Sequence, residues 1–207
     1  MIRVHIVDDH PVVRQGLKRV LAADSDIVVT GESSDGESAV SAALAGGFDI
    51  LVLDLTLPGL SGFDVLARVR AGRPALKVLV LTMHAERHYA MRVLRNGAHG
   101  YLTKDSPPTA VLEAIRVIAR GERYVPSNVA ASLIDAPKAD SPHDKLTERE
   151  LAVLVAIGRG QTPSEIATML ELSNSTVSTH ISRIRAKLDA RSIGDIVRYA
   201  VQSGLVK

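Results

Sequence analysis

The N-terminal part of the chain alternates between two hydrophobic patterns. Short runs that are apolar on consecutive positions predict strands at residues 4–7, 27–30, 49–54, 77–82 and 100–103. The segments between them carry apolar residues at three- and four-residue steps and predict amphipathic helices at residues 11–23, 36–45, 62–72, 86–96 and 108–120. Strands that are apolar on both faces favour a parallel sheet with crossover helices. Residues 1–122 are therefore predicted to form an α/β, doubly wound (βα)5 domain.

The pattern changes after residue 122. The second half of residues 123–145 has no sustained apolar stripe, and Pro, Asp, Ser and Lys predominate there. A loop of that length is unusual inside a compact domain. We interpret the stretch as a linker, with a short helix predicted at residues 126–134.

From Leu146 onward the pattern is helical. Thr147-x-x-Glu150 and Thr162-x-x-Glu165 have the spacing of capping boxes, which predicts helices at residues 148–158 and from residue 163. Ser173 is a suitable cap for a third helix at 174–188, and a fourth is predicted at 192–203. A short helix followed by a longer, basic one indicates a helix-turn-helix. Residues 146–207 are therefore predicted to be an all-α, four-helix helix-turn-helix domain.

Composition narrows the function classes. The chain has no cysteine, which excludes disulfides, thiol catalysis and thiolate metal sites. The N-terminal sequence reaches acidic residues too early for a signal peptide, and no apolar stretch is long enough to span a bilayer. We expect a cytoplasmic protein with no membrane partner. A net charge of +2 gives no general affinity for nucleic acid, so DNA binding would depend on a local stripe of Arg183, Arg185, Lys187 and Arg191.

Acidic side chains follow two of the predicted strands. Asp8 and Asp9 come after the first strand, and Asp54 ends the third. If these strands are neighbours, the three carboxylates converge at one edge of the sheet and need a cation, for which Mg²⁺ is suited. Asp54 could then attack phosphorus as a carboxylate nucleophile. The plainer interpretation is that Asp8 and Asp9 cap the helix near Pro11 and that Asp54 caps its own turn.

Two more polar side chains lie at strand ends. Thr82 closes the fourth strand and can donate a hydrogen bond to a phosphoryl oxygen. Lys104 follows the fifth strand and can place an ammonium against phosphoryl charge. Taken singly, Thr82 is explained equally well as an ordinary strand residue, and Lys104 as a solvated residue at the end of a strand. Their register with the acidic residues favours a shared site.

These residues together resemble the receiver domain of two-component response regulators. The match consists of Asp8-Asp9, Asp54 followed by Leu-Thr-Leu-Pro-Gly, Thr82 and Tyr101-x-x-Lys104. The resemblance implies that a sensor histidine kinase phosphorylates Asp54, and that Mg²⁺ is held by Asp8, Asp9, Asp54 and the backbone carbonyl of Thr56. It also implies that Thr82 moves toward the phosphoryl group and lets Tyr101 rotate inward. Self-phosphorylation and slow autodephosphorylation would then be the only reactions.

The C-terminal part resembles the LuxR-type DNA-binding domain, which makes the whole chain similar to the NarL/FixJ class. The matching residues are Leu146-Thr147-x-Arg149-Glu150, Gly160, Glu165-Ile166-Ala167, Ser173, Thr176-Val177, His180 and Lys187-Leu188. The resemblance implies that the third helix enters the major groove of promoter DNA and that the fourth provides a dimer contact. The DNA-binding candidates are Ser173, Thr176, Ser178, Thr179, Ser182, Arg183 and Lys187. Many members have Lys directly after Thr-Val, and Ser178 here removes that phosphate partner.

Three functions are open at this point. The first is a transcription factor in which phosphorylation of Asp54 promotes homodimerisation and promoter binding. The second is a phosphatase similar to the haloacid dehalogenases, although Thr56 stands where such an enzyme needs an acid/base Asp. The third is a scaffold that works unphosphorylated, against which the complete set of site residues argues. Neither a G-x-G-x-x-G nor a Walker A sequence occurs, so nucleotide binding is disfavoured.

Overall fold

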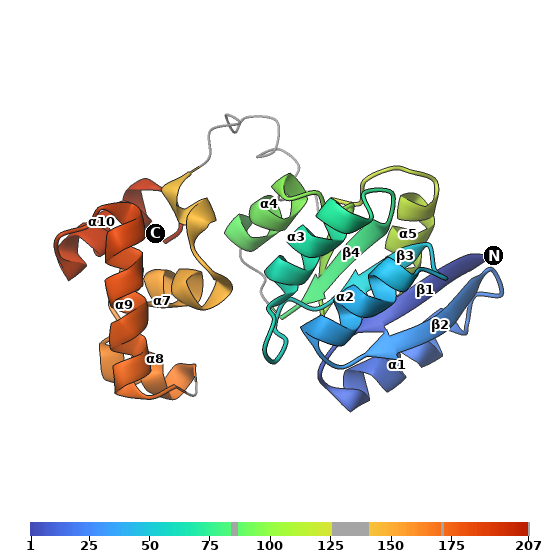
Figure 1. The fold of residues 1–207 in the computed structure, drawn as a ribbon, viewed down its shortest axis with the longest axis horizontal. Helices are drawn as coiled ribbons and strands as arrows, with labels where there is room; N and C mark the ends of the chain where they lie inside the picture. Colours follow the sequence, from blue (N-terminus) through green and yellow to red (C-terminus); the bar gives the residue numbers. More distant parts are fainter. Residues whose placement is uncertain (84–86, 126–140, 171, 207) are drawn as a thin grey trace. The chain divides into compact units, whose positions relative to one another are not determined.

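The chain forms two compact units. The computed structural model describes residues 1–83, 87–125, 141–170 and 172–206, and its units are Met1–Ala136 and Pro137–Lys207 (Figure 1). The division falls within the predicted linker, residues 123–145. The helix predicted at 126–134 lies outside the described residues. Tyr124 forms a parallel bridge with Gly100, so the N-terminal unit continues past residue 122.

The N-terminal unit is a doubly wound α/β domain, as predicted. Its strands are β1 (Ile2–Val7), β2 (Ile27–Ser33), β3 (Ile50–Leu53), β4 (Lys77–Thr82) and β5 (Gly100–Thr103). Its helices are α1 (Pro11–Leu21), α2 (Gly36–Ala45), α3 (Gly62–Gly72), α4 (Arg87–Arg95) and α5 (Pro108–Ala119). All four strand pairs are parallel, and the strand order is β2-β1-β3-β4-β5.

This strand order brings the ends of β1 and β3 together. The chain adds β2 on one side of β1 and then returns to place β3 on the other side, so the topological switch point lies between β1 and β3. Val7 at the end of β1 pairs with Leu53 at the end of β3. The residues that follow these two positions are Asp8 and Asp54, which therefore emerge side by side.

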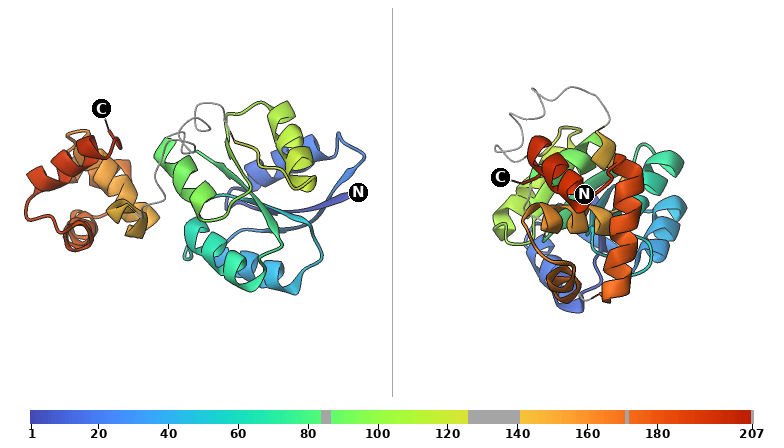
Figure 2. Two further views of the ribbon diagram at one scale, coloured as in Figure 1. Left: turned by 90° about the horizontal axis from the view of Figure 1, so that it is seen from above. Right: turned by 90° about the vertical axis from the view of Figure 1, so that its left-hand side faces the viewer.

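Helices cover both faces of the sheet. Helices α1 and α5 pack on one face, and α2, α3 and α4 pack on the other (Figures 1 and 2). The core under α1 and α5 includes Ile6, Leu21 and Ile115, each fully buried. Every residue of β3 is at most 1% exposed. Burial on both faces explains why this strand is apolar at consecutive positions.

The C-terminal unit is entirely helical, also as predicted. It consists of a 3₁₀ turn (Pro142–Lys145), α7 (Glu148–Gly158), α8 (Pro163–Met169), α9 (Asn174–Leu188) and α10 (Ile193–Gln202). Both predicted capping boxes are present, and Ser192 with Asp195 forms a third that the sequence reasoning did not identify. In the part of the chain that the structure describes, no helix is both long and apolar enough to cross a bilayer.

One buried carboxylate joins α7 to α9. The Glu150 side chain is 2% exposed, and its Oε2 lies 2.7 Å from the Lys187 Nζ of α9. The same oxygen accepts the backbone N–H of Thr147 at 2.7 Å, which caps α7. Burial alone would raise the pKa of Glu150, but the Lys187 ammonium and the Thr147 amide outweigh it and hold the pKa below the ordinary 4.5.

The lowered pKa of Glu150 predicts acid sensitivity of the C-terminal unit. The carboxylate contributes its full stabilisation above pH 4.5, and loses it as pH falls through the lower pKa of the folded state. We expect Glu150→Gln to reduce the free energy of unfolding by about 2 kcal/mol near neutral pH. That difference should vanish in acid, as measured by urea unfolding followed by circular dichroism. A difference that is unchanged between about pH 6 and about pH 3 would contradict the expectation.

Substitutions of Gly62 and Gly16 by alanine form a matched pair that tests packing against the backbone at Asp54 and Leu55. A Cβ on Gly62 would lie 2.3 Å from the Asp54 carbonyl oxygen and 2.5 Å from the Leu55 Cα, whereas a Cβ on Gly16 has nothing within 4 Å. We expect Gly62→Ala to destabilise the N-terminal unit by about 1–3 kcal/mol, because backbone must shift. Gly16→Ala should stabilise it by about 0.5–1 kcal/mol through helix propensity. Urea unfolding of both variants measures the difference, and equal effects would refute it.

Candidate functional site

Acidic side chains converge at the carboxyl end of the sheet. Asp8 and Asp9 follow β1, and Asp54 follows β3. One ligand atom from each of these carboxylates, together with a His10 ring nitrogen, lies within 4.8 Å of the others. Asp8 and Asp54 are each 2% exposed, so water does little to screen their mutual repulsion. The structure thus brings together the three acids that the sequence singled out.

Lys104 neutralises part of this charge. Its Nζ lies 2.6 Å from Asp8 Oδ2 and 2.7 Å from Asp54 Oδ2, so one ammonium bridges the two buried carboxylates. The backbone N–H of Lys104 donates to the Thr82 carbonyl at 2.8 Å, which ties the end of β5 to that of β4. The strand ends therefore aim the lysine at the acids.

The electrostatics of the pocket leave it short of positive charge. Burial raises the pKa of Asp54, and the Asp8 carboxylate adds to the rise, although Lys104 opposes it. Burial would lower the pKa of Lys104, but its hydrogen bonds to Asp54 and Asp8 raise it above the ordinary value. Among the described residues, one ammonium contacts two of the three carboxylates, and Asp9 lies against the His10 ring instead. Their hard oxygen donors and uncompensated charge fit a divalent cation such as Mg²⁺.

Turn capping and site formation use different oxygens of the same acids. Asp8 Oδ1 accepts the His10 amide at 2.9 Å, and Asp54 Oδ1 accepts the Thr56 amide at 3.3 Å. In both residues it is Oδ2 that binds Lys104. Turn capping and a shared site are therefore compatible for Asp8 and Asp54, whereas the predicted capping of the helix near Pro11 by Asp8 and Asp9 is wrong. The N-cap of α1 is His10, and its side chain makes no capping hydrogen bond.

Thr82 and Tyr101 are buried in β4 and β5, the two strands whose ends lie next to this pocket. Thr82 is 0% exposed at the end of β4 and pairs with Thr103, which directly precedes Lys104. Tyr101 in β5 is 2% exposed, so its ring is already inside the unit. The Thr56 amide lies near Asp54, whereas cation binding by the Thr56 carbonyl stays a prediction.

Two site residues were missed by the sequence reasoning. His10 Nδ1 lies 2.6 Å from Asp9 Oδ1, and Arg14 Nη1 donates to the Asp8 backbone carbonyl at 2.7 Å. Their position in the sequence could have identified them, because His10 directly follows the acidic pair and Arg14 lies one helical turn after His10.

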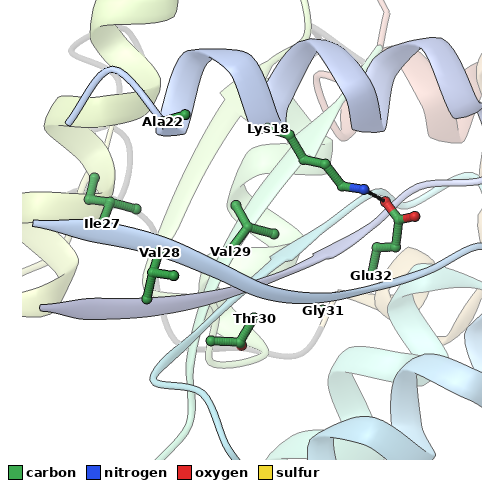
Figure 3. Close-up of a pocket in the computed structure, with 8 residues that line it drawn as sticks. All are labelled: Lys18, Ala22, Ile27, Val28, Val29, Thr30, Gly31 and Glu32. Carbon is green, nitrogen blue, oxygen red and sulfur yellow. Dashed lines mark ion pairs between the residues drawn. The ribbon is translucent and has the colours of Figure 1, made fainter. Parts of the chain in front are cut away.

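A pocket elsewhere in this unit is unrelated to the acids. It has a volume of about 450 Å³ and lies between α1 and the edge strand β2 (Figure 3). Val28 and Val29 are among its lining residues. Its two charged residues, Lys18 and Glu32, form an ion pair of 2.7 Å and so neutralise each other. It therefore offers no charged group that is left for a ligand.

The start of α9 carries the hydroxyl residues predicted to contact DNA. Ser173 caps the helix by accepting the Thr176 amide at 3.1 Å. Ser178 and Thr179 are exposed, and their hydroxyls donate to carbonyls one turn earlier. Ser182 is exposed as well. The outer surface of α9 is thus lined by short polar side chains.

The basic residues of α9 differ in what they contact. Lys187 is paired with Glu150. Arg185 donates to the carbonyls of Ala190 and Arg191, beyond the end of the helix. Within the described residues, Arg183 is exposed and makes no ion pair or hydrogen bond. The charge stripe read from the sequence therefore contains one cation that is already neutralised.

Comparison with known families matches both units. Residues 4–116 match the response regulator receiver domain, and residues 144–200 match the luxR family of bacterial regulatory proteins. The chain is 35% identical to the response regulator UvrY of Escherichia coli K12 over 99% of its own length and 96% of that protein. It is 34% identical to the oxygen regulatory protein NreC of Staphylococcus carnosus, covering 99% of each.

A solved relative shows the same architecture on DNA. The response regulator RcsB in a DNA complex is 25% identical, with a TM-score of 0.61 and 99% of both chains covered. The full-length matches, the parallel sheet order and the helix-turn-helix agree on one assignment. The chain belongs to the two-component response regulators of the NarL/FixJ class, which join a receiver domain to a LuxR-type DNA-binding domain.

Proposed function

We propose that this transcriptional response regulator is phosphorylated on Asp54 by a sensor histidine kinase in the cytoplasm. We further propose that phosphorylation promotes homodimerisation and promoter binding. The observation that carries the proposal is the Lys104 ammonium, which lies within 2.7 Å of two nearly inaccessible carboxylates, one of them Asp54. Burial and paired charge of this kind are typical of functional sites.

The residues of the pocket suit phosphoryl transfer. An oxygen of Asp54 attacks the phosphorus of a phosphohistidine, a P–O bond forms, and the P–N bond breaks with its electron pair going to the imidazole. Lys104 is placed to pair with the phosphoryl oxygens as Asp54 gains them. Mg²⁺ held by Asp8, Asp9, Asp54 and the Thr56 carbonyl would neutralise charge on the incoming phosphoryl group.

The switch follows from the same contacts. Lys104 bridges Asp8 and Asp54, and a phosphoryl group on Asp54 changes the acceptors available to it. The buried Thr82 hydroxyl is proposed to donate to the phosphoryl group, and Tyr101 to respond in the next strand. Differential contacts of this kind shift the population between two conformations.

We propose that α9 enters the major groove. Ser173, Thr176, Ser178, Thr179, Ser182 and Arg183 lie at its start or on its exposed surface, and the solved RcsB–DNA complex supports DNA binding by this architecture. No observation favours the phosphatase, whose acid/base Asp is replaced by Thr56, or the phosphorylation-independent scaffold.

Phosphorylation of Asp54 is tested with a small phosphodonor and Mg²⁺. We expect phosphate that is labile to base and hydroxylamine, as an acyl phosphate is, on the wild-type chain, and background amounts on Asp54→Asn because the nucleophile is gone. Chelation of the metal with EDTA should also abolish labelling. Asp49→Asn is the matched control, because Asp49 precedes the same strand at its other end and pairs with Arg3 on the surface. Intact-protein mass spectrometry measures the label, and a labelled Asp54→Asn chain would refute the assignment.

The output is tested by DNA binding with and without phosphodonor. We expect phosphorylation to tighten binding of the wild-type chain to a duplex selected from a random library by about 5–150-fold, the usual size of allosteric coupling. Asp54→Ala should bind equally in both conditions, as measured by fluorescence anisotropy. If wild type and Asp54→Ala respond alike to the phosphodonor, the proposed control of DNA binding is wrong.

A further inference from the structure

Lys187 lies at the border of the inward face of α9. Val177 and Ile184 on this face are fully buried, and Lys187 follows Ile184 after three positions, close to one turn. Arg183 lies further round the helix and is exposed. The Lys187 side chain is 34% exposed, and its ammonium reaches inward to α7.

Glu150 accepts from the Lys187 ammonium and is too buried to lose this partner without a large cost in free energy. Glu150 Oε2 lies 2.7 Å from Lys187 Nζ, and the Glu150 side chain is only 2% exposed. If Lys187 moved to a DNA phosphate, a buried carboxylate would be left without its countercharge, which is strongly unfavourable. We therefore expect the pair to persist when DNA binds.

The neighbouring histidine does not replace Lys187. Burial lowers the pKa of His180 despite the opposing effect of the Glu150 charge, so the ring stays neutral near neutral pH. Its Nδ1 is buried and has no hydrogen-bond partner among the residues described. Neutralisation of Glu150 thus depends on Lys187.

We propose that Lys187 is a positioning residue and makes no phosphate contact: its ion pair with Glu150 fixes the recognition helix α9 against α7. One carboxylate oxygen both caps α7 and holds α9, so the two helices share one fixed point. This inference rests on the proposed DNA binding by α9, and it removes Lys187 from the phosphate-contacting residues.

The test uses the phosphorylated full chain and the duplex that the wild type selects from a random library. DNA affinity is measured between about 50 and 200 mM salt for Lys187→Met, for Glu150→Gln/Lys187→Met, and for Arg183→Met as the matched control. Circular dichroism and stoichiometric titration give the folded, active fraction of each variant, so that lost affinity is separated from lost fold. Lys187→Arg tests rescue by a conservative cation.

Four results are expected. Lys187→Met weakens binding but keeps the wild-type slope of log affinity against log salt, whereas Arg183→Met makes the slope shallower by about 0.9, the value for one phosphate. The double variant binds more tightly than Lys187→Met, because the unpaired carboxylate is removed too. Lys187→Arg restores most of the lost affinity.

The opposite results would overturn the inference. A slope loss for Lys187→Met as large as that of Arg183→Met would make Lys187 a phosphate contact. Unchanged affinity for Lys187→Met, or a double variant no better than the single one, would remove its positioning role. If the wild-type chain selects no duplex, the proposed function is wrong and the inference falls with it. Failure of the variants alone refutes only the inference.

Discussion

The receiver domain depends on keeping like charges together at the edge of a parallel sheet. Asp8 and Asp54 are almost wholly buried, and the strand order forces them to emerge from paired positions. Without the Lys104 ammonium between them, mutual repulsion and desolvation would act against the fold itself. The arrangement is therefore tolerated only with cations present, and it responds to any group that changes their balance. A phosphoryl group is such a group.

In both domains, a buried carboxylate binds two partners at once and so connects helices or strand ends to one another. In the receiver, Asp54 uses one oxygen for its own turn and the other for Lys104. In the output domain, a single Glu150 oxygen takes the Thr147 amide and the Lys187 ammonium. A carboxylate that binds both a backbone N–H and a lysine ammonium fixes the orientation of the lysine side chain as well as balancing its charge. The consequences differ, because the receiver pocket can gain new ligands whereas Glu150 is enclosed.

The sequence was sufficient for the architecture and for much of the site, for identifiable reasons. Strands such as β3 are apolar throughout because both faces are covered, and capping residues such as Thr147 act on positions three residues away. The polar end of β2, from Gly31 to Ser33, was missed because an edge strand is only partly buried. The pairing of Lys187 with Glu150 joins positions 37 residues apart. No local pattern reports such a contact, so the sequence predicts a DNA contact for Lys187 and not its pairing with Glu150.

In the part of the chain that the structure describes, the edge strand β2 has an unpaired outer edge to which a strand of another chain could add. Its sequence, Ile-Val-Val-Thr-Gly-Glu-Ser, has neither proline nor lysine to discourage pairing with another chain. Its register with β1 slips between Val4 and His5, so that Thr30 has no strand partner. Such a bulge increases local twist and interrupts the regular ladder that a foreign strand would extend. The irregularity therefore makes β2 a poorer template for a second chain, in a strand that carries neither proline nor lysine.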